Sequence, residues 1–387
     1  MNKEIIPRYL NLSHFLNKKS CFLFGPRSSG KTVWIKQTLP DALYINLLNS
    51  VQRRAFYENP NRLLKVLEAE KKSFVIIDEI QKVPELLDEI HMILVEQENK
   101  YTFLLTGSSP RKLKRSGANL LGGRAKRLDF FPFCWVELFK VQQFNLEKFL
   151  TVGGLPKVYL GDDPQSELED YFNIYLNEEI REETAIRNIR GFENFLVCSA
   201  HLSGQVINYT KLANDTQLNV QTVKEYVQVL EDTLLLFRLT PFQSNIRKPV
   251  KTEKIYLFDI GVRNHLKGIP VIFPKTEIFG EAFEHFIISE VRTYVSYNRK
   301  KIEMNFWRDQ NGHEVDLVVA PYLAIEIKST TKIVAKDHKN LKIFMEEKIC
   351  KQSIIVSLDP VKEKWDDSIE HCPWDSFLQK LWEGHYF

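Results

Sequence analysis

The sequence contains few cysteines, and their spacing suggests no pairing. The five are scattered along the chain, with neither a C-x-x-C pair nor a zinc-ligand spacing: Cys21, Cys134, Cys198, Cys350 and Cys372. An odd number of isolated cysteines argues against a disulfide framework and favours reduced thiols. We therefore expect a cytoplasmic protein.

Long hydrophobic runs are absent too. No stretch approaches the length of a transmembrane helix, and the N-terminal MNKEIIPR lacks the apolar region of a signal peptide. The sequence therefore predicts no membrane partner. The net charge of +3 is small for 387 residues, so it neither demands nor excludes nucleic acid, and local patches matter more. No internal repeat is evident, and the length predicts two or three domains.

What the chain does contain is a phosphate-binding motif between a strand and a helix. The apolar run 21–24 precedes the spacing G-x-x-x-x-G-K-T, and Val33-Trp34-Ile35 follows it. Such a loop closes backbone N–H groups around phosphates at a helix N-terminus. The alternative, a chance match in a Gly/Ser loop, is weakened by the strand and helix on either side. The residues predicted to bind nucleotide are Gly25, Pro26, Arg27, Ser28, Ser29, Gly30, Lys31 and Thr32.

A second motif lies where the apolar run 73–77 ends in two carboxylates, Asp78 and Glu79. This is a Walker B pattern. Asp78 and the Thr32 hydroxyl are expected to hold Mg²⁺, and Glu79 to polarise the attacking water. Lys31 can reach the β and γ phosphates. A strand that ends in acids by coincidence is the alternative, and downstream of a P-loop it is the minor one.

Two further positions are candidates for the nucleotide site. The strand 102–109 ends in polar residues, where Ser109 or Ser108 is placed to touch the γ-phosphate; a plain turn is equally compatible. Arg124 follows two glycines in the basic stretch 111–127. It is a candidate arginine finger, acting in cis or on a neighbouring subunit of a homo-oligomer. The alternative is a solvated basic loop or a patch for a DNA backbone.

Together these motifs resemble the AAA-type P-loop ATPase domain of a large prokaryotic family, in which the ATPase precedes a domain of unknown function, DUF4143. The resemblance rests on the P-loop, on Ile77-Asp78-Glu79-Ile80-Gln81, on Thr106-Gly107-Ser108-Ser109 and on Gly122-Gly123-Arg124. It implies a parallel five-stranded sheet with helices on both faces for residues 1–145, and ATP as the nucleotide. The alternation of strands and helices agrees with this α/β fold. A second-sensor arginine, however, is not evident.

The middle of the chain is predicted to hold two smaller units. Residues 146–190 are interpreted as a helical lid, because Val152-Gly153-Gly154-Leu155-Pro156 resembles the family's Gly-Gly-x-Pro turn. Residues 191–250 show a winged-helix pattern: a helix from 209, a turn, a second helix over 221–230 and a strand. The second helix carries no arginine, so direct base reading looks weak. Packing of this unit against the lid is the slightly favoured alternative to DNA binding.

Residues 251–387 are predicted to form a further α/β domain. Asp316 lies on one strand and Glu326-Ile327-Lys328 on the next, where residues two apart share a face. This D…E-x-K constellation is similar to that of PD-(D/E)xK nucleases. Two such carboxylates hold Mg²⁺ or Mn²⁺, and the lysine orients the attacking water. Glu281 or Glu284, on the preceding helix, is expected to complete the metal site. A plain ion pair between strands is the alternative.

The sequence thus predicts an ATP-binding and ATP-hydrolysing protein that controls a DNA-directed, metal-dependent nuclease-like module. Basic side chains beside the C-terminal site, interleaved with Trp307 and Tyr322, suit a phosphate backbone, and we expect DNA rather than RNA. The alternative is an ATP-dependent switch that binds nucleic acid or a protein partner through a catalytically silent nuclease fold. An oligomeric motor acting on protein is a third, less favoured interpretation.

Overall fold

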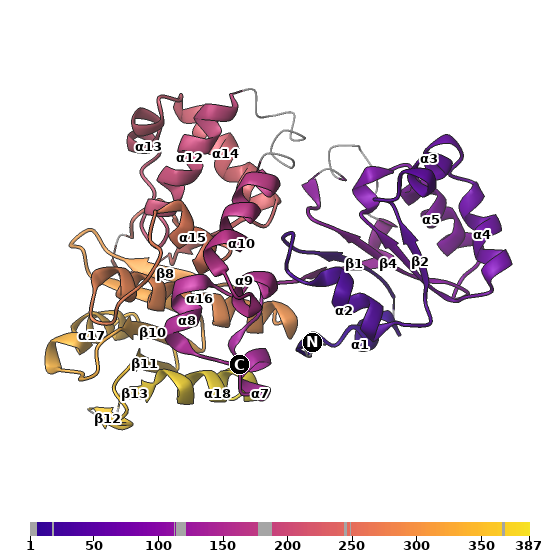
Figure 1. Ribbon diagram of the computed structural model, residues 1–387. Coiled ribbons are helices and arrows are strands. Elements are labelled where there is room, and N and C mark those ends of the chain that lie inside the picture. Colours follow the sequence, from indigo (N-terminus) through magenta and orange to yellow (C-terminus); the bar gives the residue numbers. More distant parts are fainter. Residues whose placement is uncertain are drawn as a thin grey trace. The chain divides into compact units, whose positions relative to one another are not determined.

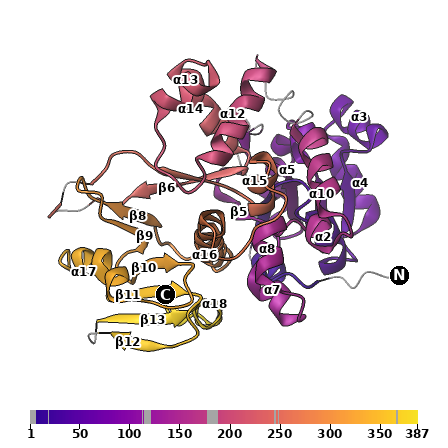
Figure 2. The same cartoon turned by 60° about the vertical axis from the view of Figure 1, so that its left-hand side comes forward.

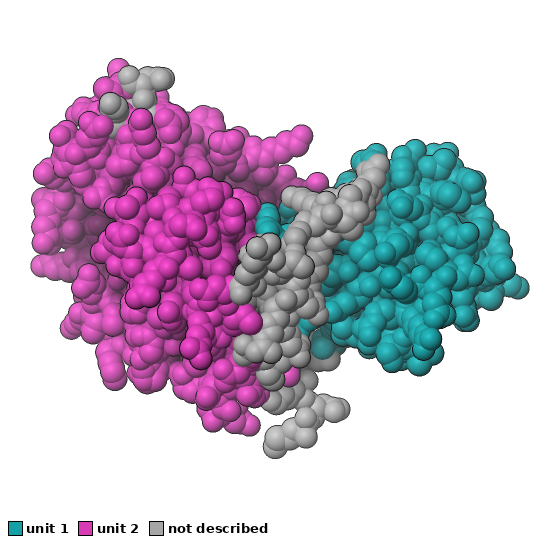
Figure 3. All heavy atoms as spheres, turned by 90° about the horizontal axis from the view of Figure 1, so that it is seen from above, with its two compact units in different colours: residues 1–132, 232–234 teal, residues 133–231, 235–387 magenta. Residues whose placement is uncertain are grey.

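The computed structural model describes residues 6–17, 19–111, 113, 121–176, 188–243, 246–247, 249–365 and 368–387. They form two compact units, teal and magenta in Figure 3. The first unit comprises Met1–Pro132 and the short segment Asp232–Leu234, and the second comprises Phe133–Glu231 and Leu235–Phe387.

The first unit is built on a five-stranded sheet in which every strand pair is parallel. The strand order is β2 (Leu43–Asn46), β3 (Phe74–Asp78), β4 (Thr102–Gly107), β1 (Ser20–Phe24) and β5 (Ala125–Asp129). The three central strands, β3, β4 and β1, are mostly apolar and buried, which suits the interior of a parallel sheet because both of its faces are covered. The predicted five-stranded parallel sheet is thereby confirmed.

Helices surround this sheet in the first unit (Figure 1). They are α1 (Leu12–Leu16), α2 (Lys31–Thr38), α3 (Ser50–Glu58), α4 (Arg62–Glu70) and α5 (Leu86–Glu96), with the short turns η1 (Ile80–Lys82) and η2 (Leu121–Gly123). Alternate strand residues such as Phe22 and Ile77 pack into one core with Leu67 and Ile90. The intervening residues, among them Leu23, are buried as well, so both faces of the sheet are covered.

The second unit begins with short helices. They are α7 (Trp135–Lys140), α8 (Leu146–Val152), α9 (Pro156–Leu160), α10 (Pro164–Asp170), the single π-helical turn η3 (Tyr171–Leu176), α12 (Ile189–His201), α13 (Tyr209–Thr216), α14 (Val220–Asp232) and α15 (Ile260–Leu266). The Gly-Gly-x-Pro turn packs against the start of α15. The Gly154 N–H donates to Asp259 Oδ2 at 2.8 Å, and a Cβ on Gly153, whose φ is +75°, would lie 2.1 Å from Asp259 Oδ1. Glycine is therefore required at position 153.

The second unit also contains a mixed sheet of eight described strands. Their order is β12 (Glu363–Trp365), β13 (Ile369–Pro373), β11 (Gln352–Ser357), β10 (Leu323–Lys328), β9 (Glu314–Val319), β8 (Asn305–Arg308), β6 (Leu236–Pro241) and β7 (Lys254–Leu257). Its helices are α16 (Glu277–Tyr297), η4 (Ala335–His338), α17 (Lys339–Met345) and α18 (Trp374–Glu383). Figure 2 shows the strands from β6 to β12 in succession, with α16 beside them. The α/β prediction holds for this unit too.

Candidate nucleotide site and a buried carboxylate cluster

The P-loop joins β1 to α2 and is shaped by its glycines. Gly30 has φ +90° and precedes the first residue of α2, a backbone conformation that other residues rarely adopt. Gly25 is required for packing, because a Cβ there would lie 2.2 Å from the carbonyl oxygen of Phe130, just after β5. The loop is therefore fixed at one end by the tight turn at Gly30 and at the other by the segment that follows β5.

The predicted phosphate and magnesium ligands converge below this loop. Lys31 is buried, and its Nζ donates to the carbonyl oxygens of Gly25 at 2.5 Å and Pro26 at 2.9 Å. The hydroxyl of Thr32 donates to Asp78 Oδ2 at 3.2 Å. Residues far apart in the sequence are thus brought together as the two motifs predicted. The oxygen donors of Thr32 and Asp78 are those that Mg²⁺ prefers.

Asp78 has two further partners that were not candidate site residues in the sequence. It is buried, and it accepts hydrogen bonds from Tyr44 on β2 and from Thr106 on β4, the two strands that flank β3. Burial and the nearby Asp78 carboxylate raise the pKa of Tyr44, so its phenol remains a donor. In the sequence, Tyr44 is distinguished by its polar hydroxyl within an otherwise apolar strand. That strand, β2, lies next to the Walker B strand in the sheet.

Gln81 connects the candidate base to the neighbouring strand end. Its side-chain amide donates to Glu79 and lies 3.4 Å from the Ser108 hydroxyl. The Glu79 N–H in turn donates to Thr106 Oγ1 at 3.3 Å. Glu79 has φ +61°, which is unusual for a residue with a side chain. Gln81 and Thr106 therefore hold Glu79 at a fixed place beside Ser108.

The other two candidates of the nucleotide site have different partners. The Ser109 hydroxyl donates to the carbonyl oxygen of Asp232 at 2.9 Å, and Arg111 forms an ion pair of 2.7 Å with the Asp232 carboxylate. Arg124 is exposed, and its guanidinium lies 3.2 Å from His91 Nε2 on α5. Of the predicted basic stretch, Lys112, Lys114 and Arg115 lie outside the described residues.

The predicted C-terminal constellation is brought together in the second unit. Strands β9 and β10 pair antiparallel, and Asp316 Oδ2 accepts a hydrogen bond of 2.7 Å from the Ile327 N–H. The Lys328 ammonium lies 2.6 Å from Glu326 Oε1. Both carboxyl groups are buried. Burial and mutual repulsion raise the pKa of Asp316 well above its usual range, and burial raises that of Glu326.

A lysine that the sequence did not single out adjoins these acids. Lys254, on β7, is 3% exposed, and its Nζ lies 2.5 Å from Glu314 Oε1 and 3.2 Å from Glu284 Oε1. The Tyr256 hydroxyl donates to the same Glu284 oxygen at 2.7 Å. Burial alone would lower the pKa of Lys254, but the surrounding acids, chiefly Glu284, raise it well above its usual value.

Two glutamates of α16 were predicted as alternative metal ligands. Glu284 is the one that lies beside Lys254 and the strand acids. Glu281, one helical turn away, pairs with Arg263 and lies 2.7 Å from the Lys267 ammonium. Within the described ranges, no group of three or more His, Cys, Asp or Glu side chains is arranged to hold a metal ion.

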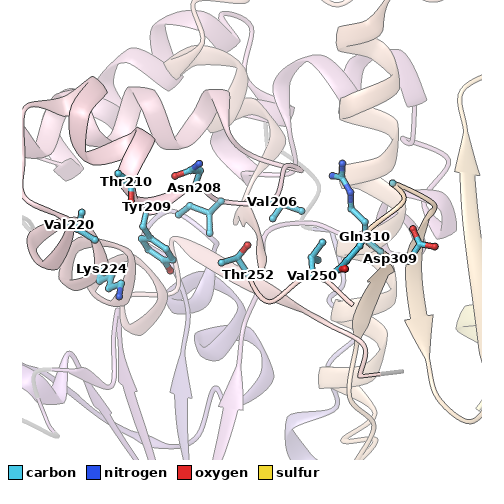
Figure 4. Close-up of a pocket in the computed structure, with 13 residues that line it drawn as sticks. Val206, Asn208, Tyr209, Thr210, Val220, Lys224, Val250, Thr252, Asp309 and Gln310 are labelled. Carbon is cyan, nitrogen blue, oxygen red and sulfur yellow. The ribbon is translucent and has the colours of Figure 1, made fainter. Parts of the chain in front are cut away.

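The second unit also contains an open polar pocket of about 680 Å³. It is lined by the start of α13, by α14, by the segment before β7 and by the turn between β8 and β9. Figure 4 shows Tyr209 and Lys224 on one wall and Asp309 and Gln310 on the opposite one. The Lys224 ammonium lies 5.6 Å from the Tyr209 ring centre, and the Tyr209 hydroxyl donates to Glu253 at 2.5 Å.

Comparison with known families finds a domain model that covers the first of these sites. An AAA domain model matches residues 17–139, which include the P-loop, the Walker B strand and all five strands of the parallel sheet. The chain carries an AAA-type P-loop domain. This AAA domain is followed by matches to two domains of unknown function, DUF8612 over residues 143–271 and DUF4143 over residues 279–377. Neither description states an activity.

Two relatives that match most of the chain are named as uncharacterized proteins. One from Methanocaldococcus jannaschii is 24% identical over 82% of this chain and 75% of its own length. Another, from Mycobacterium tuberculosis, is 24% identical over 80% of this chain and 70% of its own length. A solved Signal Transduction ATPase with Numerous Domains from Pyrococcus horikoshii matches 76% of this chain and 48% of that chain, at 13% identity and a TM-score of 0.28. No described helix has the length and apolar character of a membrane span.

Proposed function

We propose that the chain binds Mg²⁺-ATP at the P-loop of its AAA domain and hydrolyses it, so that the nucleotide state serves as a switch for the second unit. The observation that carries this proposal is the contact between Thr32 and Asp78, because it joins the P-loop to the Walker B strand at a pair of oxygen ligands suited to Mg²⁺. Lys31 lies at the base of the same loop.

Each residue has a separate role in this proposal. Lys31 contacts the β and γ phosphates, and Thr32 and Asp78 hold the magnesium ion. When bound, that ion neutralises charge on the phosphates. Glu79, fixed by Gln81, accepts a proton from the attacking water. Ser109 is proposed as a sensor of the γ-phosphate and Arg124 as an arginine finger in cis or in trans.

Two substitutions separate binding from chemistry. Lys31→Ala should abolish ATP binding, because it removes the ammonium that faces the phosphates. Glu79→Gln should retain binding and lower kcat by about 100-fold or more, the usual range for loss of a general base. Equilibrium binding of a fluorescent ATP analogue and phosphate release measure the two quantities.

Lys36→Ala is the matched control for Lys31→Ala, because Lys36 is an exposed lysine on the same helix. It should leave binding and hydrolysis unchanged. Normal ATP affinity in Lys31→Ala would refute the P-loop assignment, and normal hydrolysis in Glu79→Gln would refute the role of Glu79.

A second candidate function is metal-dependent cleavage of DNA by the C-terminal module, which the AAA domain would control. It is favoured by the proximity of Asp316, Glu326 and Lys328, the residue types of PD-(D/E)xK nucleases. In this proposal Asp316 and Glu326, with Glu281 or Glu284, hold Mg²⁺ or Mn²⁺. We propose residues 146–190 as the lid and residues 191–250 as the winged helix. The winged helix is supported by α13 and α14, joined by residues 217–219, and by the strand β6 that follows them.

Plasmid and single-stranded DNA, with Mg²⁺ or Mn²⁺ and with or without ATP, test this second function. We expect cleavage by the wild-type protein that Asp316→Ala and Lys328→Ala both lose. Absence of cleavage on both substrates, alongside measurable ATP hydrolysis, would favour the alternative in which the nuclease fold is silent and the switch acts on a nucleic-acid or protein partner.

A further inference from the structure

A short segment between α14 and β6 belongs to the first unit, although the chain on either side of it belongs to the second. The chain leaves the second unit after Glu231 and returns to it at Leu235. We call the residues between them, Asp232–Leu234, the inserted segment. Leu234 is 8% exposed and lies in the hydrophobic core of the first unit, which also contains Leu121. Its φ of +62° is a strained conformation for a residue with a side chain.

Polar contacts also hold the inserted segment, at the end of strand β4. The Ser109 hydroxyl donates to the carbonyl oxygen of Asp232 at 2.9 Å. The Arg111 guanidinium lies 2.7 Å from the Asp232 carboxylate, and this ion pair is partly shielded from water, because the two side chains are 16% and 25% exposed. The Ser109 oxygen in turn accepts a hydrogen bond of 3.0 Å from the Arg111 N–H. Ser109 and Arg111 therefore act together on Asp232.

The same strand end is part of the candidate nucleotide site. The carbonyl oxygen of Gly107 accepts a hydrogen bond of 3.3 Å from the N–H of Gly25 in the P-loop. Thr106, one residue earlier, donates to Asp78 on the Walker B strand. Ser109 follows two residues after Gly107. The P-loop, the Walker B strand and the inserted segment are thus all attached to the end of β4.

The Ser109 hydroxyl has a single hydrogen, which limits it to one acceptor at a time. In the structure that hydrogen goes to the Asp232 carbonyl. If Ser109 donates instead to the γ-phosphate of ATP, as in the proposed function, its bond to Asp232 is lost. The γ-phosphate and the inserted segment therefore compete for one donor. ADP has no γ-phosphate and does not compete.

We propose that the inserted segment is a latch that ATP opens and that closes again when ADP is bound. The γ-phosphate takes the Ser109 hydrogen from Asp232, and the strained backbone at Leu234 relaxes as the segment leaves the core. Because the segment connects α14 to β6, its release carries the nucleotide state into the second unit. This inference rests on the proposed ATP switch and deepens it by naming the segment that the nucleotide moves.

The latch has a consequence for nucleotide affinity, because the coupling between two binding events is reciprocal. If ATP opens the latch, a substitution that weakens the latch must raise the affinity for ATP. The affinity for ADP should stay the same, since ADP does not draw on Ser109. A substitution that only disturbs the fold of the first unit would instead lower both affinities, so the sign of the change separates the two cases.

The test is calorimetric titration of the full chain, in Mg²⁺, with ADP and with the non-hydrolysable ATP analogue AMP-PNP. Asp232→Asn keeps the size of the side chain and removes the charge that pairs with Arg111. Leu234→Ala removes the buried side chain. We expect each variant to bind AMP-PNP about fivefold or more tightly than wild type, the lower end of usual allosteric couplings, and to bind ADP within about twofold of wild type.

Two substitutions are matched controls. Glu225→Gln removes the charge of an exposed acid on α14, whose carboxylate accepts a hydrogen bond from Gln221 on the same helix. Leu235→Ala removes the next leucine along the chain, which is 7% exposed but belongs to the second unit. Both controls should leave the affinities for AMP-PNP and ADP at their wild-type values.

Hydrogen–deuterium exchange reports the opening of the latch directly. In the wild-type protein, peptides that cover the inserted segment should exchange faster with AMP-PNP bound than with ADP bound, because the segment leaves a protected core. In Leu234→Ala the exchange should be fast with either nucleotide, since the variant lacks the side chain that holds the segment in that core.

The latch is overturned if both nucleotides bind to wild type and either folded variant shows no gain in affinity for AMP-PNP. An equal gain for AMP-PNP and ADP, or equal exchange of the wild-type segment with both nucleotides, would overturn it as well. If Leu234→Ala does not fold, Asp232→Asn decides, because it changes only a partly exposed ion pair. A wild-type chain that binds neither nucleotide would refute the proposed function itself, and the latch with it.

Discussion

At the scale of single residues, both sites show how a buried charge is kept in the folded protein. Asp78 is compensated by three hydroxyl groups, from Thr32, Tyr44 and Thr106. Lys254 is compensated by carboxylates of other elements. The first arrangement surrounds the Asp78 carboxylate with neutral donors, whereas the second pairs a lysine with carboxylates.

Gln81 gives a prediction at this scale. Gln81→Met keeps the volume of the side chain but removes the amide that donates to Glu79. The loss of one hydrogen bond to a charged group is worth about 1.5–3 kcal/mol, so we expect kcat for ATP hydrolysis to fall roughly tenfold or more. ATP affinity should stay within about twofold, because Gln81 has no place among the phosphate ligands. Steady-state phosphate release and equilibrium nucleotide binding provide the two values.

Gln37→Met, an exposed glutamine on α2, is the control and should hydrolyse ATP at the wild-type rate. A Gln81→Met protein that loses affinity and turnover equally would indicate a general disturbance of the site, and one with unchanged kcat would show that Glu79 needs no such support.

At the scale of elements, helix α16 organises the second unit through three glutamates. Glu281 contacts α15 through Arg263, and Glu284 contacts β7 through Lys254. Glu290 is buried and accepts hydrogen bonds from the Trp135 N–H of α7 at 2.7 Å and from the Trp382 indole of α18 at 3.0 Å. One helix thus carries the contacts that fix four other elements.

Glu290 makes the stability of this unit depend on pH. Burial raises its pKa from 4.5 to about 8 in the folded protein. Between these values the folded state keeps the proton and the unfolded state loses it, so the contribution of Glu290 is full below pH 4.5 and falls as the pH rises towards 8. Glu290→Gln does not titrate. Relative to wild type, its urea midpoint should therefore improve from pH 5 to pH 8.

Tryptophan fluorescence suits this measurement, because every tryptophan except Trp34 lies in the second unit. Glu303→Gln changes an exposed glutamate of the same unit and should follow the wild-type trend with pH. A constant difference between Glu290→Gln and wild type from pH 5 to pH 8 would show that Glu290 is ionised in the folded protein throughout.

At the scale of the whole molecule, much of the first unit could be predicted from the sequence. The P-loop and the Walker B strand are short contiguous motifs. The first contains the residues of the phosphate-binding turn, and the second contains the carboxylates at the end of its strand. The parallel five-stranded sheet that the family resemblance implied is present. The segment Asp232–Leu234 could not be predicted in this way. Leu234 is buried in the core of the first unit, yet in the sequence it looks like any other residue of an apolar strand.

The sequence by itself determined which residues carry the nucleotide chemistry, because that chemistry lies in short contiguous motifs. It also placed Asp316, Glu326 and Lys328 on adjacent strands. Only the tertiary structure placed Glu284, and not Glu281 one helical turn away, next to the strand acids, and only it placed Lys254 beside them. The physical reason is that the compensation of a buried charge depends on pairings between distant segments, and β7 and β9 are separated in the sequence by the whole of α16.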